Sequence, residues 1–125
     1  MSYDDQNIFA KILRGEIPCD KVYEDDYALA FRDIAPQAPV HVLVIPKGPY
    51  VSMADLSANA SDAEIAGLFR AVGVVARQLG LDETGYRTIA NNGRDAHQEV
   101  PHLHVHIFGG RSMRGMIPKP KPEDG

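Results

Sequence analysis

Cysteine, tryptophan and long apolar runs are scarce or absent in this sequence. Its one cysteine, Cys19, excludes an internal disulfide and a zinc site built on a cysteine pair. No apolar run approaches the roughly 18 residues that a membrane-spanning helix needs. No basic segment followed by an apolar one opens the chain, as it would in a secretory signal. We therefore expect a cytoplasmic protein with no membrane partner.

Positive charge is also in short supply. The 125 residues include 13 Lys and Arg against 17 Asp and Glu, which gives a net charge of −4. A chain with this balance has no broad basic surface to hold a nucleic-acid backbone, so we expect no nucleic-acid partner. Any nucleotide ligand should be small. The length is that of one compact domain.

The order of the predicted elements indicates an α+β fold. Apolar residues at helical spacing predict a short helix at 7–13 and a long one that begins at Ser61, where Ser61 and Glu64 fit a capping box. The long helix is expected to end at Gly80. Runs typical of strands cover 21–24, 27–32, 40–45, 86–90 and part of 98–110. Together they predict a five-stranded, mostly antiparallel sheet in one domain, 1–110, followed by an extended or flexible tail, 111–125.

The segment from Gln98 to Gly110 carries the main chemical signal. Three histidines alternate with three branched apolar residues, in the order His102, Leu103, His104, Val105, His106 and Ile107. Alternation of this kind predicts a strand with the imidazoles on one face and core residues on the other. At about 3.3 Å per residue, neighbouring imidazole positions lie roughly 6.6 Å apart. A phosphate, a metal ion or a row of waters could span that distance.

Three interpretations of this histidine face compete. A metal site needs ligands that converge to about 2 Å from one ion, but the outer two positions lie roughly 13 Å apart. A bent strand or the separate His41 would have to complete such a site. A polar sheet face that merely tolerates histidine does not account for three in register. Chemistry on phosphorus does, because neutral imidazole can attack a phosphoryl group and protonated imidazole can donate to its oxygens or to a leaving group.

The motif at residues 102–108 resembles the alternating-histidine signature of the histidine triad (HIT) superfamily. Further similarity to its Hint branch, the histidine triad nucleotide-binding proteins, covers residues 7–13, 31–41, 44–47, 91–93 and 98–100. The resemblance implies a HIT-like fold and a homodimer, with the long helix and the fourth strand at the interface. It also implies hydrolysis of purine nucleoside phosphoramidates and of adenylates carried on amines or amino acids, with release of a nucleoside monophosphate. The alternative is a nucleotide-binding regulatory or scaffold protein whose hydrolysis is incidental.

The resemblance also implies roles for individual residues. His104 would be the nucleophile that forms a nucleotidyl-histidine intermediate, and His106 would contact the phosphate and the bridging atom. His102 and His41 would support the nucleophile's tautomer from behind. Asp33 would bind the ribose hydroxyls of an AMP-like or GMP-like nucleotide. Further contacts would come from Asn91 and Gln98, which place ribose and phosphate, and from the walls of a base pocket: Phe9, Ile12, Ile17, Phe31 and Ile34.

The residues alone leave some of these roles open. Asp33 follows a predicted strand in a bend limited by prolines, where it can accept two hydroxyl donors or simply initiate a turn. Phe9 and Phe31 would be ordinary core residues without the resemblance. Many relatives bind zinc through Cys-x-x-Cys near the first helix. Asn7 and Ala10 stand at those two positions here, so we expect no structural metal and no cofactor.

Overall fold

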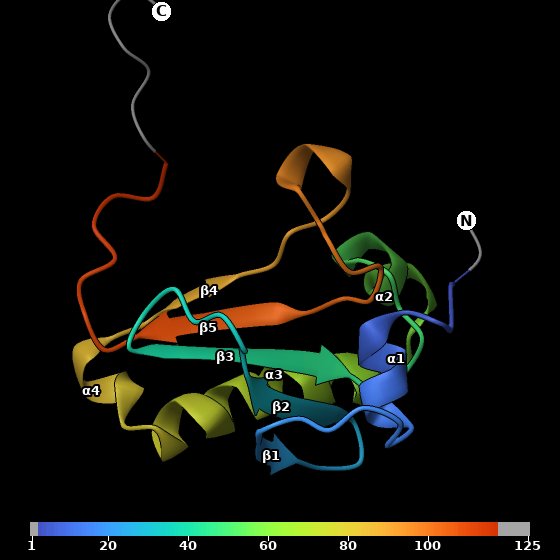
Figure 1. Cartoon of the computed structure of the whole chain (residues 1–125), viewed down its shortest axis with the longest axis horizontal. Helices are drawn as coiled ribbons and strands as arrows, with labels where there is room; N and C mark the ends of the chain where they lie inside the picture. Colours follow the sequence, from blue (N-terminus) through green and yellow to red (C-terminus); the bar gives the residue numbers. More distant parts are fainter. Residues whose placement is uncertain (1–2, 118–125) are drawn as a thin grey trace, which may run out of the picture.

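Five strands form one antiparallel sheet in the order β1-β2-β3-β5-β4. The computed structural model describes residues 3–117. Its strands are β1 (Lys21–Glu24), β2 (Ala28–Arg32), β3 (Val40–Pro46), β4 (Arg87–Ile89) and β5 (Val105–Gly109). Its helices are α1 (Ile8–Leu13), α2 (Met53–Asn59), α3 (Asp62–Gln78) and α4 (Leu81–Thr84), with a 3-10 helix, η1 (Arg94–Ala96). The predicted α+β fold with a five-stranded antiparallel sheet is confirmed (Figure 1).

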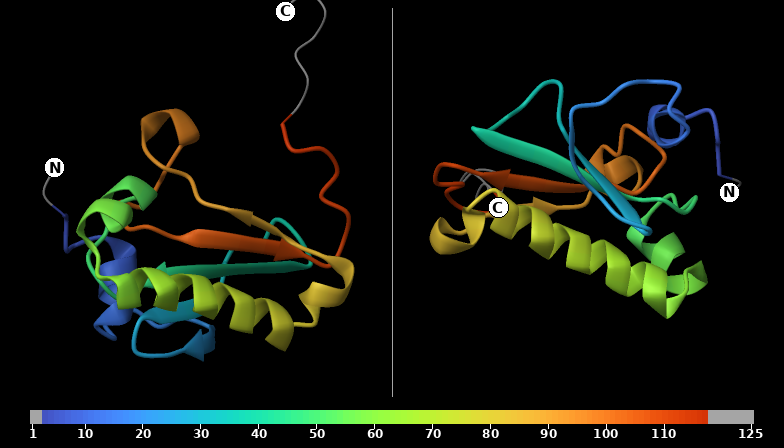
Figure 2. Two further views of the ribbon diagram at one scale, coloured as in Figure 1. Left: turned by 180° about the vertical axis from the view of Figure 1, so that it is seen from behind. Right: turned by 90° about the horizontal axis from the view of Figure 1, so that it is seen from below.

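The central strands are buried on both faces. Side chains along a strand alternate between the two faces, so a doubly buried strand shows a continuous apolar run. Helix α3 lies along one side of the sheet and α1 lies on the other (Figure 2). The α3-side core includes Ala28, Ala30, Val42, Val44, Leu68, Ala71, Val75 and Ile107. The α1-side core includes Phe9, Leu29, Phe31, Leu43 and Ile45.

Capping residues fix the ends of the helices against this sheet. The Ser61 side chain accepts from the Glu64 amide and the Glu64 side chain accepts from the Ser61 amide, which is the predicted capping box of α3. Gly80 follows the end of the helix with a φ of 71°, in the left-handed region that glycine favours. On the other side of the sheet, Asn7 caps α1 by accepting from the Ala10 amide.

The pairing of β3 with β5 brings two distant histidines together. His41 lies opposite Phe108, and Leu43 lies opposite His106. Positions two apart on a strand share a face, so all four side chains lie on the α1 side, where Leu43 is part of the core. His41 and His106 are therefore diagonal neighbours on one face, although 65 residues separate them in the chain.

The histidine segment is less regular than its alternation predicts. Strand β5 begins only at Val105, so the third histidine lies in the strand and the first two precede it. The prediction of a continuous histidine strand is wrong because the Leu103 amide donates to the carbonyl of Tyr50, outside the sheet, and does not join the ladder. The branched apolar residues Leu103, Val105 and Ile107 are buried, as the alternation predicts.

The chain after β5 is described only as far as residue 117. Residues 111–117 contain no helix or strand. The guanidinium of Arg87 on β4 donates to the carbonyls of Met113, Arg114 and Gly115, which ties this part of the predicted tail to the sheet. The rest of that tail, 118–125, lies outside the described residues. Within residues 3–117, no helix is both long and apolar enough to cross a bilayer.

Candidate active site

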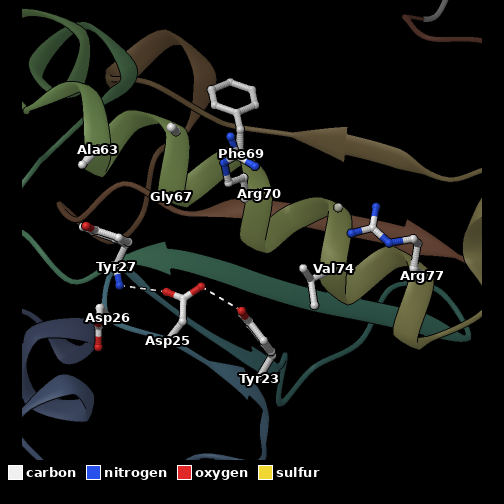
Figure 3. A pocket seen from close by; sticks show the side chains of 12 residues that line it. Tyr23, Asp25, Asp26, Tyr27, Ala63, Gly67, Phe69, Arg70, Val74 and Arg77 are labelled. Carbon is white, nitrogen blue, oxygen red and sulfur yellow. Dashed lines mark hydrogen bonds between the residues drawn. The ribbon is translucent and has the colours of Figure 1, made fainter.

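A cavity of about 390 Å³ lies on the α1 side of the sheet. Its lining residues are Phe9, Asp33, Ala35, Gln37, Leu43, Asn91, His97, Glu99, Val100, His104 and His106. A larger hollow of about 840 Å³ lies between α3 and the β1–β2 hairpin (Figure 3). No histidine, cysteine, serine or threonine is among the described residues that line it. The smaller cavity is therefore the candidate active site.

The predicted site residues fall into three groups. Those that line the cavity are Phe9, Asp33, Asn91, His104 and His106. His41 and His102 are buried and do not line it, but each makes a hydrogen bond to one of the two cavity histidines. The predicted residues that do not line it and make no such bond are Gln98, Ile12, Ile17, Phe31 and Ile34.

His104 is held so that one ring nitrogen has no hydrogen-bond partner among residues 3–117. Its Nδ1 lies 2.8 Å from the carbonyl oxygen of His102. A carbonyl only accepts, so Nδ1 carries the proton and Nε2 keeps its lone pair. The ring packs edge-to-face with Phe9, at a centroid distance of 5.0 Å and an interplanar angle of 79°. Burial lowers the pKa of His104, which favours a neutral, nucleophilic imidazole.

A chain of hydrogen bonds orders the protons of His41 and His106. The backbone amide of Gln37 donates to Nδ1 of His41 over 3.1 Å. Because Nδ1 accepts, a neutral His41 carries its proton on Nε2, which lies 2.9 Å from Nδ1 of His106 and donates to it. His106 then carries its own proton on Nε2. That N–H has no hydrogen-bond partner among residues 3–117, so it can donate to a ligand in the cavity.

One group of side chains in the described residues has the spacing of a metal site. The ligand atoms of Asp33, His41 and His106 all lie within 4.8 Å of one another. The donors do not fit a metal, because Nε2 of His41 carries a proton while Nδ1 accepts from Gln37. Metal at Nε2 would require an imidazolate or the loss of that amide bond. In this tautomer these three side chains do not offer a metal site, and a site that works without metal stays a prediction.

Asp33 initiates the turn that its position in the sequence allows, and it also faces the histidines. Its Oδ1 accepts from the Ala35 amide over 2.8 Å, which closes the turn after β2. Its Oδ2 lies 3.5 Å from Nε2 of His41, and the side chain is only partly exposed. One carboxylate oxygen thus shapes the bend, and the other faces the histidines at the wall of the cavity.

Comparison with known proteins agrees with this geometry. The family model described as HIT domain matches residues 14–113. The chain belongs to the HIT family. It is 65% identical over 118 residues to a 13.2 kDa HIT-like protein of Azospirillum brasilense, an alignment that covers 94% of this chain and 97% of that protein. It is 44% identical over 113 residues to the purine nucleoside phosphoramidase of Escherichia coli strain K12, covering 90% and 94%. The structure of a histidine triad protein from Clostridium difficile is similar to this one with a TM-score of 0.80 at 43% identity, covering 94% of this chain and 100% of that one.

Gln98 and Ile34 of this HIT protein are placed differently from the expectation. The Gln98 side chain donates through Nε2 to the carbonyls of Val51 and Val100, and its Oε1 accepts from the Gly93 amide. Both amide hydrogens are thereby engaged within the protein, so in this conformation Gln98 braces the loop and does not face a phosphate. Ile34 is 99% exposed and lies outside the cavity.

The other predicted wall residues lie in or beside the core. Phe31 is a buried member of the α1-side core, and Ile12 packs against that core. Ile17 is half-buried. Phe9 and Leu43 belong to the same core and also line the cavity, so the cavity has an apolar floor. Their contact with a purine base stays a prediction.

Three polar lining residues of the HIT protein were missed as site residues. Glu99 stands three residues before the first histidine of the motif, and that closeness was the signal for it. His97 has a φ of 57°, in the left-handed region that is uncommon outside glycine, and residue type does not reveal this. Gln37 acts through its backbone amide, which every residue except proline possesses.

The pKa values of the cavity histidines predict activity at acidic pH. Burial lowers the pKa of His104, and burial together with the neighbouring imidazoles lowers that of His106 to about 4. A lowered pKa keeps each ring neutral to a lower pH than the ordinary value of about 6.5 allows. The pH dependence of kcat/KM for hydrolysis reports the ionisation of groups in the free enzyme. We therefore expect kcat/KM to begin its fall on the acid side well below pH 6.5. A fall of kcat/KM at or above pH 6.5, measured at constant ionic strength, would contradict neutral imidazoles at His104 and His106.

Proposed function

We propose that this HIT protein hydrolyses purine nucleoside phosphoramidates through a nucleotidyl intermediate on His104. The observation that carries the proposal is the free Nε2 of His104 beside the free Nε2–H of His106, with ring centroids 5.1 Å apart in one cavity. One phosphoryl group can meet both rings. The 44% identity to the Escherichia coli purine nucleoside phosphoramidase supports the same reaction class. Action in the cytoplasm, without metal or cofactor, stays a prediction.

The proposed reaction has two displacements at phosphorus. Nε2 of His104 attacks the phosphorus, the phosphorus–nitrogen bond breaks, and the amine leaves with a proton taken up from solvent, so that the nucleotide is held on the imidazole. Water then attacks the same phosphorus and gives up one proton to solvent, and the bond to Nε2 of His104 breaks, which releases a nucleoside monophosphate and restores the His104 lone pair. The Nε2–H of His106 donates a hydrogen bond to the phosphoryl oxygens in both steps and to the bridging nitrogen in the first. Asp33 and Asn91 hold the ribose.

The charges around the cavity favour a phosphoramidate over a polyphosphate. Two carboxylates, Asp33 and Glu99, are among its lining residues, and no lysine or arginine is among those described. A ligand with a single charge on phosphorus suits such a site. A dinucleoside polyphosphate carries several negative charges, which would lie close to the two carboxylates with no cation to offset them.

The direct test of the proposed function is turnover of adenosine 5′-phosphoramidate. We expect AMP and ammonia in equal amounts, and a nucleotidyl adduct on a histidine peptide after rapid denaturation at alkaline pH. Tight binding of AMP without turnover would favour the alternative, a nucleotide-binding regulatory or scaffold protein. Faster hydrolysis of diadenosine tetraphosphate under the same conditions would contradict the assigned substrate class.

We infer that the protein forms a homodimer through α3 and β4. Strand β4 is an edge strand, since β5 is its one partner in the described residues. Phe69 of α3 is 60% exposed, and Tyr86 and Ile89 at β4 are exposed as well. Phe69 and Tyr86 border a groove of about 470 Å³ between the two elements. A second copy would bury these side chains and pair the two edge strands across a twofold axis.

Replacing Phe69 by glutamate should separate this dimer. A charge placed in an apolar contact is costly to desolvate, so we expect the dissociation constant to rise by about 100-fold or more. Sedimentation at micromolar concentration then reports mostly monomer. The matched control is Ile8→Glu, because Ile8 is an exposed apolar residue on α1, on the opposite side of the sheet. A Phe69→Glu protein that sediments like the Ile8→Glu protein would contradict the inferred interface.

A further inference from the structure

A hydrogen-bond network that the proposed chemistry does not use joins the half-buried Tyr3 to the buried Asn7 and His102, behind the cavity. The Tyr3 hydroxyl oxygen is 2.5 Å from Nδ1 of His102, and the Asn7 side chain donates to that oxygen over 2.9 Å. On the other side of the ring, Nε2 of His102 is 2.8 Å from the carbonyl oxygen of Pro46. Neither Tyr3 nor Asn7 lines the cavity. His102 is completely buried, so both of its nitrogens depend on these partners.

The direction of each hydrogen bond in this network follows from the groups involved. The Pro46 carbonyl can only accept, so Nε2 of His102 carries the proton. A neutral ring then has a lone pair on Nδ1, and the Tyr3 hydroxyl must donate to it. The Tyr3 oxygen in turn accepts from the Asn7 amide group. The Pro46 carbonyl thus fixes the tautomer of His102 and Tyr3 holds the opposite nitrogen of the ring, while burial, which lowers the pKa of His102, keeps the ring uncharged.

Three hydrogen bonds hold the Asn7 side chain in one orientation. Its Oδ1 accepts from the Ala10 amide over 2.9 Å as the N-cap of α1, and its Nδ2 also donates to the carbonyl of Asp4 over 2.7 Å. A side chain with these three bonds cannot rotate without losing the cap. The position of the Tyr3 hydroxyl is therefore set by the start of α1.

The network reaches the proposed nucleophile through the backbone of His102. The carbonyl of His102 accepts from Nδ1–H of His104 and so sets which nitrogen of His104 is free. This stretch of chain precedes β5, so the strand ladder does not hold it. A His102 ring fixed at both nitrogens limits rotation of the residue whose carbonyl orients His104.

We propose that Tyr3 is a positioning residue for catalysis, whose hydroxyl acts through His102 to hold His104 in its reactive tautomer and orientation. This inference rests on the proposed function, because it takes His104 as the nucleophile. It assigns to the segment before α1 a part in the chemistry, although that segment does not line the cavity. Tyr3 affects turnover and not ground-state binding, since it touches no ligand.

The test compares Tyr3→Phe with Tyr23→Phe. Both changes remove one hydroxyl and keep the ring, but the Tyr23 hydroxyl bonds to Asp25 on the β1–β2 hairpin. For Tyr3→Phe we expect kcat to fall by about tenfold with KM within about twofold, since a small displacement of a reacting group costs rate. Nitrogen-15 NMR of the imidazoles should also show Nδ1 of His102 losing its hydrogen bond while the ring keeps the Nε2–H form. Tyr23→Phe should match the wild type in all three measurements.

A second variant guards against a fold that fails without the Tyr3 hydroxyl. Asn7→Ser keeps a capping oxygen for α1 but removes the donor to Tyr3, so we expect a smaller fall in kcat in the same direction. Unchanged kcat and an unchanged Nδ1 resonance of His102 in the folded variants would overturn the inference. If the wild type itself forms no nucleotidyl adduct, the proposed function fails. If the wild type forms the adduct and Tyr3→Phe turns over like Tyr23→Phe, only the role of Tyr3 fails.

Discussion

Replacement of His104 by alanine is expected to lower kcat for adenosine phosphoramidate by about 10⁴-fold or more, because loss of a nucleophile removes the covalent route. The affinity for AMP should stay within about threefold. The imidazole is one of many groups that line the cavity, and the proposed ribose contacts of Asp33 and Asn91 remain in the variant. Steady-state turnover and calorimetric titration with AMP measure the two effects separately. The nucleotidyl adduct should disappear from the mass spectrum.

The His104→Ala experiment needs a control for preparation and folding. Lys21→Ala suits this purpose, because Lys21 lies on β1 with an exposed side chain that pairs with Glu24 at the surface. It should turn over like the wild type and melt within about 2 °C of it, as exposed substitutions usually change stability little. Retention of more than about a hundredth of the wild-type kcat in His104→Ala would remove this residue from the nucleophile's role.

Replacement of His106 by alanine is expected to cost less in kcat, and by an amount that depends on the leaving group. For an alkylamine leaving group we expect a loss of about 100- to 1,000-fold, in the range of general-acid and hydrogen-bond catalysis. For the p-nitrophenyl ester of AMP, whose leaving group needs no proton, we expect a loss of roughly tenfold. The difference arises because the Nε2–H of His106 is the free donor at the end of the chain from Gln37 and His41.

The control for His106 is a side chain that keeps part of the hydrogen bonding. In His106→Gln the side-chain amide can accept from Nε2 of His41 and still present an N–H to the ligand. The His106→Gln variant should therefore lose less activity than the His106→Ala variant. Equal losses for the amine and the aryl substrate would contradict a role of His106 at the leaving group. In that case the role of His106 would be limited to stabilising the phosphoryl oxygens.

Local sequence rules predicted the parts of the fold that depend on local chemistry. The capping box at Ser61 and the left-handed Gly80 bound α3 because both act within a few residues of themselves. The apolar runs of β2 and β3 identified strands, although only the packing of helices on both faces explains why the runs are continuous. The short helices α4 and η1 were not predicted, because three or four residues are too few to show a helical period.

The candidate site was predictable where side-chain chemistry decides it, and not where the backbone does. Alternation pointed to the histidine segment, but it could not show that the Leu103 amide donates to Tyr50 outside the ladder, so that β5 begins only at Val105. The pairing of His41 with His106 depends on strand register, and the proton order of both rings depends on the amide of Gln37. Residue type alone determines neither the register of two strands nor which backbone amide donates to a side chain.

The two cores differ in what a mutation within them can change. The α1-side core contains Phe9 and Leu43, which also form the floor of the cavity, so repacking there alters the shape offered to a nucleotide. The α3-side core lies across the sheet and contributes no lining residue. Substitutions such as those at Ala71 or Val75 can therefore raise or lower thermal resistance while the chemistry stays the same. Directed evolution of this scaffold can therefore change the α3-side core to alter thermal stability and the α1-side core to alter the range of substrates.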